Sequence, residues 1–532
     1  MPQIPTQTQI LVIGGGPGGS FSAAALAREG FEVTLFEADK FPRYHIGESL
    51  LPSVRPFLQF VGAEEKVMEQ GFCPKPGAAI KFNQHKREGY TDFIGRGPEF
   101  GSWNVSRSAF DHLLLQHASS CGVKVFENTK VNTIEFQKQD DPKSRPVAVN
   151  YKNSEGKEGR ITFDYLVDAS GRNGVMSTKY LKNRHNNETL KNIAIWGYWE
   201  NCGRYKPGTN REGAIWIEAL TDESGWAWFI PLEKNLVSVG VVMNHAQSIQ
   251  KRNAFREESG NPNSSLHDFY LSQVKLAPGL VSDLIPNGRM VEKEGGPIVR
   301  QASDYSYSAD SYAGPRYRLV GDAACFIDPF FSSGVHLAFT GGLSAAGTIA
   351  TSIRGAASEE ECVKWHDTKV AVSYTRFMLV VLGSYKQMRS QSENVLSDVN
   401  EDNFDRAFDL LRPIIQGTAD VNKKVTEDEV HRTMDFVKNV FAPTDPELEA
   451  AVQQRVAPEF FEGGDILLPS QVEAMFDDED VKHVLHVVNA RKPVHKMFDT
   501  QKEFGSEPIN GYTIKLVRGE LGMVRPQSIV VA

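Results

Sequence analysis

Cysteine is scarce in this chain of 532 residues, and its placement excludes the structures that cysteines most often build. The five cysteines (Cys73, Cys121, Cys202, Cys325 and Cys362) are scattered, and no two have the C-x-x-C spacing. We therefore expect no disulfide framework and no zinc site, but reduced thiols in a cytoplasmic protein.

Long apolar runs are also missing. The run "FMLVVLG" at 377–383 is far shorter than the roughly 20 residues that cross a bilayer. The first residues, "MPQIPTQTQ", lack the charged and apolar regions of a signal peptide. These absences predict a protein that has no membrane partner.

An excess of basic residues is absent as well. Lys and Arg number 58 against 67 Asp and Glu, which gives a net charge of −9. Nucleic acid is not an expected partner, because phosphate backbones attract basic surfaces. The apolar content of 40% and charged content of 23% are typical of a globular protein, and the length allows two to four domain-sized units.

What the chain does contain begins with a glycine turn between two strand-like segments. "QILVI" reads as a buried strand, "FSAAALAREG" as a helix and "FEVTLFE" as a second strand. Gly14, Gly16 and Gly19 form G-x-G-x-x-G before the helix, and Glu37 ends the second strand. In this βαβ context, glycines let the backbone approach a pyrophosphate and the acid bonds a ribose hydroxyl. The pattern predicts a dinucleotide site and leaves NAD and FAD open.

The remaining segments are predicted in outline. We expect a helix over 103–118, strands at "VKVFEN" and "FDYLVDASGR", a turn over 138–146, an antiparallel sheet within 190–245, a loop over 251–265, and mostly helices from about 335, one of them capped by Asp445.

Three later segments resemble signatures of FAD-dependent aromatic hydroxylase-type proteins. They are "WNVSRSAFD" (103–111), "DASGRNG" (168–174) and "RLVGDAACFIDP" (318–329). In that family the acid that matches Asp322 bonds the ribityl chain, and the arginine that matches Arg107 contacts the flavin. The resemblance favours FAD over NAD.

Two tryptophans narrow the resemblance. "GWAWFIP" (225–231) places Trp226 and Trp228 two residues apart, so they share one face of a strand, where they could simply pack a core. However, W-x-W-x-I-P resembles the diagnostic motif of flavin-dependent halogenases. "RYHIGES" (43–49) and "DPFFSSGVHLAF" (328–339) resemble the fungal phenol-type branch, which includes radicicol-pathway-like halogenases of aromatic polyketides.

The resemblance implies a set of site residues. Those expected at FAD are Gly14, Gly16, Pro17, Gly19, Ser20, Glu37, Arg43, Gly47, Glu48, Ser49, Arg107, Asp322 and Val335. Chloride is expected at Ser333 and Gly334, and Trp226, Trp228 and Phe331 are expected to line a tunnel. A helix start flanked by small residues suits a halide, because its N–H groups are free and no cation holds the ion too tightly. Ser332 or Ser333 could equally be a plain helix cap.

One position departs from the tryptophan halogenases. They carry a glutamate just before the matching Ser/Thr pair, and this chain has Phe331 there. The departure speaks against free tryptophan as the substrate and favours a phenol, whose own hydroxyl activates the ring.

The family also needs a lysine that receives the oxidised halogen. In phenol and pyrrole halogenases it lies in K-x-G, which matches Lys75-Pro76-Gly77. The neutral amine is the nucleophile, so burial that lowers the pKa would help. Lys81 is the rival, but it falls in an alternating strand pattern that predicts a cavity edge or a solvated face.

The predicted fold is α/β: an FAD-binding domain of the glutathione-reductase or aromatic-hydroxylase type over residues 1–345. It contains an inserted antiparallel sheet (about 72–102 and 185–300) and is followed by a mostly helical region, 346–532, that closes the substrate cavity. The predicted activity is chlorination or bromination of a phenolic ring with O2, halide and FADH2, the last of which a separate flavin reductase supplies. A single-component aromatic hydroxylase, a geranylgeranyl-reductase-type flavoprotein and a non-catalytic flavin carrier are the alternatives.

His483, His486 and His495 are not expected to bind metal, because no further ligand set accompanies them.

Overall fold

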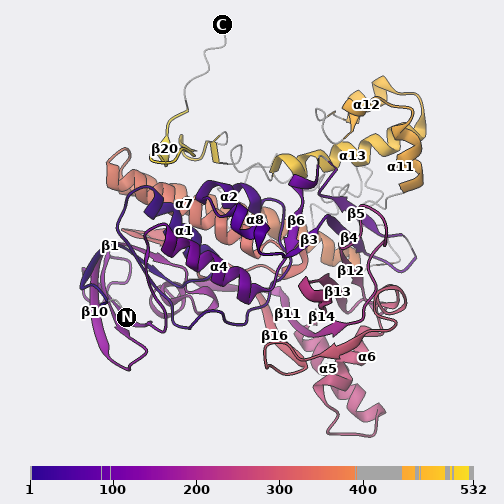
Figure 1. Cartoon of the computed structure of the whole chain (residues 1–532), viewed down its shortest axis with the longest axis horizontal. Helices are drawn as coiled ribbons and strands as arrows, with labels where there is room; N and C mark the ends of the chain where they lie inside the picture. The colour runs from indigo at the N-terminus through magenta and orange to yellow at the C-terminus, as the bar shows by residue number, and fades with distance from the viewer. Residues whose placement is uncertain are drawn as a thin grey trace.

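The computed structural model describes residues 3–85, 87–95, 97–389, 391, 446–461, 467, 469–497, 504–505 and 508–526. Two large sheets and a layer of long helices make up most of it (Figure 1). The helix cap expected at Asp445 lies outside the described residues, and the helix α11 begins at Pro446.

The first sheet is mostly parallel and is built on the predicted βαβ unit. Its strands follow the order β17-β18-β10-β1-β2-β7, and β1 runs parallel to both β2 and β10. The continuous apolar run of β1 fits a strand that is covered on both faces. The strands are β1 (Gln7–Ile13), β2 (Val33–Phe36), β7 (Lys124–Phe126), β8 (Lys130–Phe136), β9 (Pro146–Lys152), β10 (Glu158–Asp168), β17 (Ala313–Gly314) and β18 (Tyr317–Leu319). β8 and β9 pair antiparallel around the turn predicted over 138–146.

Helices from distant parts of the sequence pack together on this sheet (Figure 1). They are α1 (Pro17–Arg28), α2 (Val54–Val61), α3 (Glu64–Glu69), α4 (Arg107–Ser120) and α7 (Gly334–Arg354). α1 and α7 meet with their backbones close, because a Cβ on Gly342 would lie 3.2 Å from the carbonyl oxygen of Gly18. The glycine turn and the segment before α7 are thus connected by two helices in direct contact.

The second sheet follows the order β15-β11-β14-β13-β12-β4-β5, with β16 paired to β11. Its strands are β4 (Gly77–Lys81), β5 (Gly89–Asp92), β11 (Arg184–Glu200), β12 (Ile215–Ala219), β13 (Gly225–Pro231), β14 (Val237–Asn244), β15 (Arg289–Val291) and β16 (Val299–Ala309). The antiparallel sheet predicted within 190–245 is confirmed. α5 (His245–Glu258) and α6 (Leu266–Val274) lie against it (Figure 1).

Two local predictions were wrong. Residues 102–104 form the strand β6 (Ser102–Asn104), not the start of a helix, because they pair with β3 (Cys73–Lys75) and α4 begins only at Arg107. Most of the expected loop over 251–265 belongs to the helix α5, which Asn244 caps by accepting from the amides of Ala246 and Gln247. α5 is polar nearly all round, so it lacks the apolar stripe that identifies a helix in sequence.

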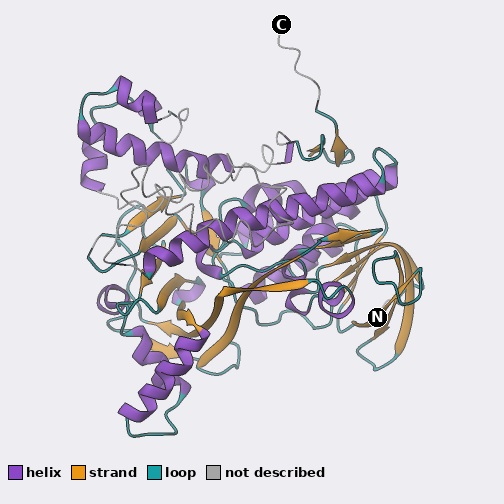
Figure 2. Ribbon diagram, turned by 180° about the vertical axis from the view of Figure 1, so that it is seen from behind, coloured by secondary structure: helices purple, strands orange, loops and turns teal. Residues whose placement is uncertain are grey.

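Among the described residues after 355, helices are the main elements, and one hairpin is the exception. α8 (Glu359–Met388) packs on α7, and α11 (Pro446–Gln453), α12 (Pro469–Met475) and α13 (Glu479–Met497) form a small cluster of their own. The exception is the hairpin of β19 (Thr513–Lys515) and β20 (Gly522–Val524), whose Met523 amide donates to Thr351 of α7 at 2.6 Å. Figure 2 shows the long helices running across the molecule, from the side of one sheet to the side of the other. The division predicted between residues 345 and 346 falls inside α7 and stays a prediction.

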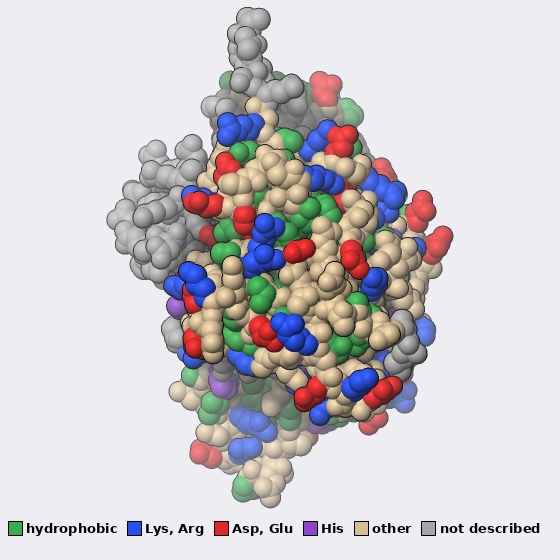
Figure 3. Space-filling model, turned by 90° about the vertical axis from the view of Figure 1, so that its left-hand side faces the viewer, with side chains coloured by type: hydrophobic (Ala, Val, Ile, Leu, Met, Phe, Trp, Pro, Cys, Tyr) green, Lys and Arg blue, Asp and Glu red, His purple; other side chains and the backbone are tan. Residues whose placement is uncertain are grey.

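Short 3₁₀ or π turns connect these elements at Pro98–Phe100, Gly171–Asn173, Val175–Tyr180, Glu233–Asn235, Leu280–Leu284, Gly321–Ala323, Pro329–Phe331 and Pro458–Phe460. Acidic and basic side chains are interspersed over the face seen in Figure 3. Within the described ranges, no helix combines the length and the apolar character needed to cross a membrane.

Candidate active site

The glycine turn leaves the start of α1 open. Gly16 is the N-cap, no side chain caps it, and the first turn contains no acid. Gly14 has φ +102°, and a Cβ on Gly19 would overlap the carbonyl oxygen of Gly14. A Cβ on Gly16 would instead find its nearest neighbour, a nitrogen of Arg43, 3.8 Å away. Gly14 and Gly19 are therefore needed by the fold, whereas the space beside Gly16 is free for a ligand that approaches the amides.

Glu37 is fastened to this turn. Its Oε2 accepts from the Gly15 amide at 2.6 Å, and its Oε1 accepts from the Asp39 amide at 2.8 Å. Burial raises the pKa of Glu37, although these two amides oppose the shift. Ser20, in the first turns of α1 with Pro17, donates to the Gly15 carbonyl at 2.8 Å. The carboxylate therefore lies beside the glycine turn, and its predicted bond to a ribose stays a prediction.

Two arginines share one buried carboxylate. Arg107 bonds Asp111 through Nε at 2.8 Å, and Arg43 bonds it through Nη1 at 2.9 Å. Burial alone would raise the pKa of Asp111, but the two guanidinium groups outweigh it and lower the pKa. Arg107 also donates to the carbonyls of Ile46 and Gly47, so it holds the "RYHIGES" segment against α4. Sequence reasoning missed Asp111, although its position four residues after Arg107 in a helix was a usable signal.

Asp322 lies in the turn that follows β18, at the same edge of the parallel sheet as the glycine turn. Burial raises the pKa of Asp322, and Arg172, Arg107 and Arg184 oppose the shift. An acid that accepts hydroxyl donors, a free helix start and nearby arginines suit a flavin dinucleotide with a ribityl chain and a pyrophosphate. These residues therefore fit FAD.

The segment before α7 is a tight turn in which the Ser332 amide donates to the Pro329 carbonyl at 2.9 Å, and the halide site expected here stays a prediction. Ser332 adopts φ +56° after the 3₁₀ turn Pro329–Phe331, and Ser333 is the N-cap of α7 without a side-chain cap. The Ser333 hydroxyl is buried and has no hydrogen-bond partner among the described residues. Gly334 is exposed, and apart from its own helix and chain neighbours no described residue lies within 4 Å of where its Cβ would be. Val335 next to it is buried.

The two tryptophans of β13 adjoin this segment. Their rings lie 5.8 Å apart, and Trp226 meets Phe330 edge-on at 5.2 Å. Phe331 is half-buried and packs against Phe330 at 5.9 Å. Trp226 thus faces the turn that precedes α7, and both tryptophans belong to the core that contains Phe330.

A buried hydrogen-bond cluster fixes the position of Trp226. Its Nε1 donates to the Tyr385 hydroxyl at 2.7 Å, and Tyr385 donates to Asp328 Oδ2 at 2.7 Å. Asn192 donates to the same carboxylate oxygen at 2.8 Å, while Asp328 Oδ1 accepts from the Phe330 amide at 3.0 Å. Tyr385 of α8 therefore connects the tryptophan pair with the turn before α7. No sequence pattern pointed to Tyr385.

Glu48 is buried in a second polar cluster. Its Oε1 accepts from Tyr198 at 2.9 Å and from Lys293 at 3.0 Å, and Tyr44 bonds Tyr198 at 2.8 Å. The Oε2 atom has no partner among the described residues. Gly47 beside it has φ +99°, which favours glycine.

Lys75 is unusual for a lysine, because its side chain is buried and only 1% exposed. Its Nζ donates to Ser49 Oγ at 2.7 Å and to the Leu50 carbonyl at 2.9 Å, and lies 5.2 Å from the centre of the Phe93 ring. Burial lowers the pKa of Lys75 to about 7. A neutral amine has two N–H donors and one lone pair. The two hydrogen bonds therefore use both donors and leave the lone pair available.

The surroundings of Lys75 also explain the glycine of K-x-G. A Cβ on Gly77 would overlap the Tyr90 side chain. β4, which starts at Gly77, belongs to the same sheet as the tryptophan strand β13. Lys81, the rival lysine, is half-buried at the end of β4.

The C-terminal histidines give no sign of a metal site. His486 bonds Glu473 at 2.8 Å, and His483 is exposed. In the part of the chain that the structure describes, no three His, Cys, Asp or Glu side chains gather as metal ligands would. The side chain of His495 lies outside what the structure describes.

Comparisons with known proteins agree with this geometry. The family model described as tryptophan halogenase matches residues 9–101 and 97–436. The flavin-dependent halogenase armH1 of Armillaria mellea is 53% identical over 98% of this chain and 99% of its own. The sulochrin halogenase gedL of Aspergillus terreus is 43% identical over 99% of this chain and 95% of its own.

A solved structure extends the match to the fold. The myxobacterial chondrochloren halogenase CndH, an FAD-dependent halogenase, superposes with a TM-score of 0.63 at 27% identity, over 83% of this chain and 98% of its own. The predicted FAD-binding α/β fold is therefore confirmed. Since relatives at about half identity match nearly the whole sequence, this chain belongs to the flavin-dependent halogenases and resembles the fungal members of that family.

Proposed function

We propose that this enzyme chlorinates or brominates an electron-rich phenolic ring, and that Lys75 delivers the halogen. The observation that carries the proposal is the burial of Lys75 with a pKa of about 7. Burial thus favours the neutral amine near neutral pH, and the free lone pair of the neutral amine is a nucleophile for electrophilic halogen. An ordinary surface lysine would be almost fully protonated there.

The FAD would be held by the residues of the glycine turn and the arginine cluster. Gly16 leaves room for the pyrophosphate at the start of α1, Glu37 and Asp322 accept from ribose and ribityl hydroxyls, and Arg107 borders the flavin. When bound and reduced, FAD supplies with O2 the oxidising power that converts halide to hypohalous acid. A separate flavin reductase would provide FADH2.

The halide would bind at the start of α7. The amides of Ser333 and Gly334 are uncapped by side chains, and the empty space beside Gly334 lets an anion approach the backbone. Trp226 and Trp228 would line the way of hypohalous acid towards Lys75 and keep the substrate apart from the flavin.

A phenolic substrate is supported by two observations. Phe331 occupies the place where tryptophan halogenases have a glutamate, so the ring must bring its own activating group. The similarity to a relative named sulochrin halogenase is a second support.

The test is mass spectrometry of a phenol panel incubated with the enzyme, FAD, a flavin reductase, NADH, air and chloride or bromide. We expect a product with the halogen isotope pattern, absent without the reductase and absent with Lys75→Met. Lys81→Met is the matched control, because it removes a half-buried lysine six residues away, and it should halogenate normally. Halogenation by Lys75→Met would remove Lys75 from the mechanism. A product that gains one oxygen, with NADH consumed without the reductase, would make the enzyme a hydroxylase.

A further inference from the structure

Asn104 is a buried amide without a partner. Its side chain is 0% exposed, and neither Oδ1 nor Nδ2 has a hydrogen-bond partner among the described residues. Ser102, two residues earlier in β6, is 3% exposed and its hydroxyl also lacks one. Buried polar groups are nearly always hydrogen-bonded, and an exception needs an explanation.

Strand pairing places both side chains beside Lys75. In the antiparallel pair β3–β6, Lys75 is opposite Ser102 and Cys73 is opposite Asn104. Ser49, which accepts from the Lys75 amine, is itself opposite Asn104 in an isolated antiparallel bridge. Directly opposite residues of antiparallel strands project to the same face. Lys75, Ser49, Ser102 and Asn104 therefore share one face.

The other face of β6 is already occupied. Trp103 and Val105 alternate with Asn104 and belong to the core under the helices, together with Phe57 and Phe110. Phe93, which the Lys75 amine approaches, belongs to the other core, which also contains Trp226 and Trp228. Asn104 thus points to the side of the molecule where the tryptophans lie.

We propose that Asn104 binds hypohalous acid at Lys75 and is a catalytic residue of halogen transfer, an inference that rests on the proposed function. An amide suits this role because it offers one acceptor and two donors without a charge. Oδ1 accepts from the O–H of hypohalous acid, and Nδ2 donates to its oxygen. Ser102 supplies a further hydroxyl on the same face.

The transfer step balances in atoms and electrons. The Lys75 lone pair attacks the halogen, so that the N–X bond forms while the O–X bond breaks and its electron pair stays on oxygen. The leaving hydroxide takes the proton that the nitrogen releases, and water departs. Nδ2 of Asn104 stabilises the charge that grows on this oxygen, as preorganised donors do in other active sites.

The decisive variant is Asn104→Leu, which keeps the approximate size and removes both polar atoms. Since these atoms have no partner among the described residues, the Tm should stay equal or rise. We expect unchanged FAD affinity and FADH2 oxidation, at least a tenfold lower kcat for halogenated product, and more hypohalous acid caught by a scavenger in solution. Ser264→Ala is the matched control, because it removes another buried hydroxyl without a described partner, in the loop before α6, and it should leave all four readings unchanged.

A second variant tests the location of Asn104 by charge. Asn104→Asp would place a carboxylate on the face of Lys75 and stabilise its ammonium form, so the acid limb of the halogenation pH profile should move up by about one unit or more. The ionisable neighbours on adjacent segments are Cys73, Glu48, Tyr90 and Asp92, and none of them contributes to the lowered pKa of Lys75. An unmoved acid limb would overturn the placement.

The outcomes separate this inference from the proposed function. Wild-type halogenation that Lys75→Met abolishes but Asn104→Leu retains would overturn the role of Asn104 alone. Halogenation that survives Lys75→Met would overturn the proposed function. A large loss of Tm or of FAD affinity in Asn104→Leu would make Asn104 a structural or flavin-binding residue and also overturn the inference.

Discussion

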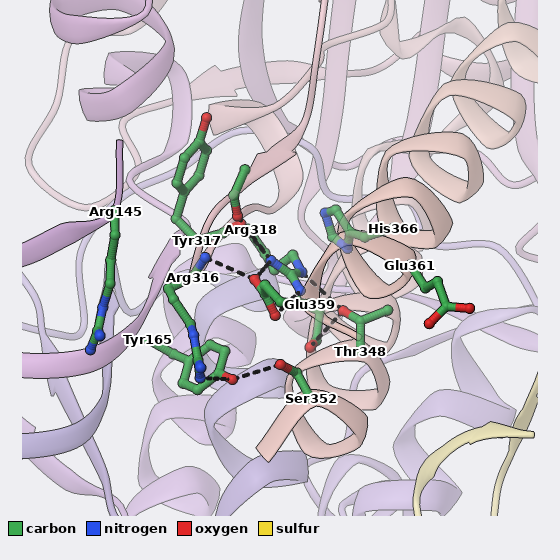
Figure 4. Close-up of polar contacts among 12 residues, drawn as sticks. Arg145, Tyr165, Arg316, Tyr317, Arg318, Thr348, Ser352, Glu359, Glu361 and His366 are labelled. Atoms are coloured by element: carbon green, nitrogen blue, oxygen red, sulfur yellow. Dashed lines mark hydrogen bonds and ion pairs between the residues drawn. The ribbon is translucent and has the colours of Figure 1, made fainter. Parts of the chain in front are cut away.

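Arg318 and Glu359 form an ion pair at 3.0 Å, and the arginine side chain is 0% exposed (Figure 4). Arg318 lies in β18, just before the Gly321-Asp322 turn, and Glu359 opens α8. Arg318 also donates to Thr348 of α7. Near its other end, α8 supplies Tyr385 to the tryptophan pair. One ion pair therefore fastens α8, which reaches the turn before α7 through Tyr385, to the sheet that carries Asp322.

Glu359→Gln should destabilise the protein by about 3 kcal/mol, because it leaves the buried Arg318 charge without its counter-charge. Chemical denaturation at pH 7.5 measures the change. The matched control is Glu360→Gln, which breaks the exposed pair with Lys364 in the same helix and should leave the free energy of unfolding unchanged. Equal effects of the two substitutions would show that the buried Arg318 pair contributes no more to stability than an exposed pair.

Acid should destabilise the fold through His366. Its ring bonds the Ser344 hydroxyl at 2.9 Å and the Leu319 carbonyl at 3.1 Å, and burial followed by the charge of Arg318 lowers the pKa of His366 to about 3. The unfolded chain takes up a proton near pH 6.5 that the folded chain refuses until about 3. Stability from this group is therefore complete above pH 6.5 and is lost as the pH falls towards 3.

Urea unfolding from pH 7 to 4 tests this dependence. His366→Gln keeps hydrogen-bonding capacity without titrating, so it should flatten the slope of unfolding free energy against pH by about one proton. An unchanged slope would mean that His366 does not carry the dependence.

Lys75→Met should stabilise the enzyme while it abolishes halogenation. Between pH 7 and 10.5 the unfolded lysine is protonated and the folded one is mostly neutral, so the destabilising effect of the lysine diminishes as pH rises through this window. The free energy of unfolding of Lys75→Met should exceed that of the wild type by up to several kcal/mol at pH 7, and the difference should shrink towards pH 10. Lys81→Met, measured in parallel, should show no such trend.

Gly16→Ala and Gly19→Ala should fail in different ways. A methyl on Gly16 meets nothing closer than 3.8 Å in the protein, so the apoprotein should keep its Tm while FAD affinity falls at least tenfold. A methyl on Gly19 would overlap the Gly14 carbonyl, so Gly19→Ala should lower the Tm even without FAD. Calorimetry of the apoprotein and FAD titration separate the two. A normal FAD affinity of Gly16→Ala would contradict the assignment of the pyrophosphate.

Tyr385→Phe should weaken the buried cluster around Trp226. The substitution removes the acceptor of the indole N–H and a donor to Asp328, at a cost of about 2 kcal/mol. A double-mutant cycle with Trp226→Phe measures the coupling between the two side chains, which should exceed about 0.5 kcal/mol. Additive effects would show that the hydrogen bond contributes nothing.

Much of this fold could be read from sequence, because its signals are local. The strand, glycine turn, helix and strand at the N-terminus follow each other within 30 residues, and each has its own pattern. The K-x-G lysine was found through resemblance, and the structure shows the burial that would help its role.

The parts that could not be predicted depend on distant partners. Ser102–Asn104 is a strand only because β3 pairs with it, and Tyr385 matters only because α8 crosses the end of β13. Asn104 looked like an ordinary polar residue in a motif, since the absence of hydrogen-bond partners is a property of the folded chain.

The contact between Gly18 of α1 and Gly342 of α7 bears on how such enzymes diversify. The spacing between the glycine turn and the segment before α7 is set by two backbones in contact. Residues elsewhere around the candidate site can therefore be exchanged, in nature or in the laboratory, without changing this spacing. Libraries aimed at new aromatic acceptors should spare the small residues of this helix crossing and vary the segments that surround it.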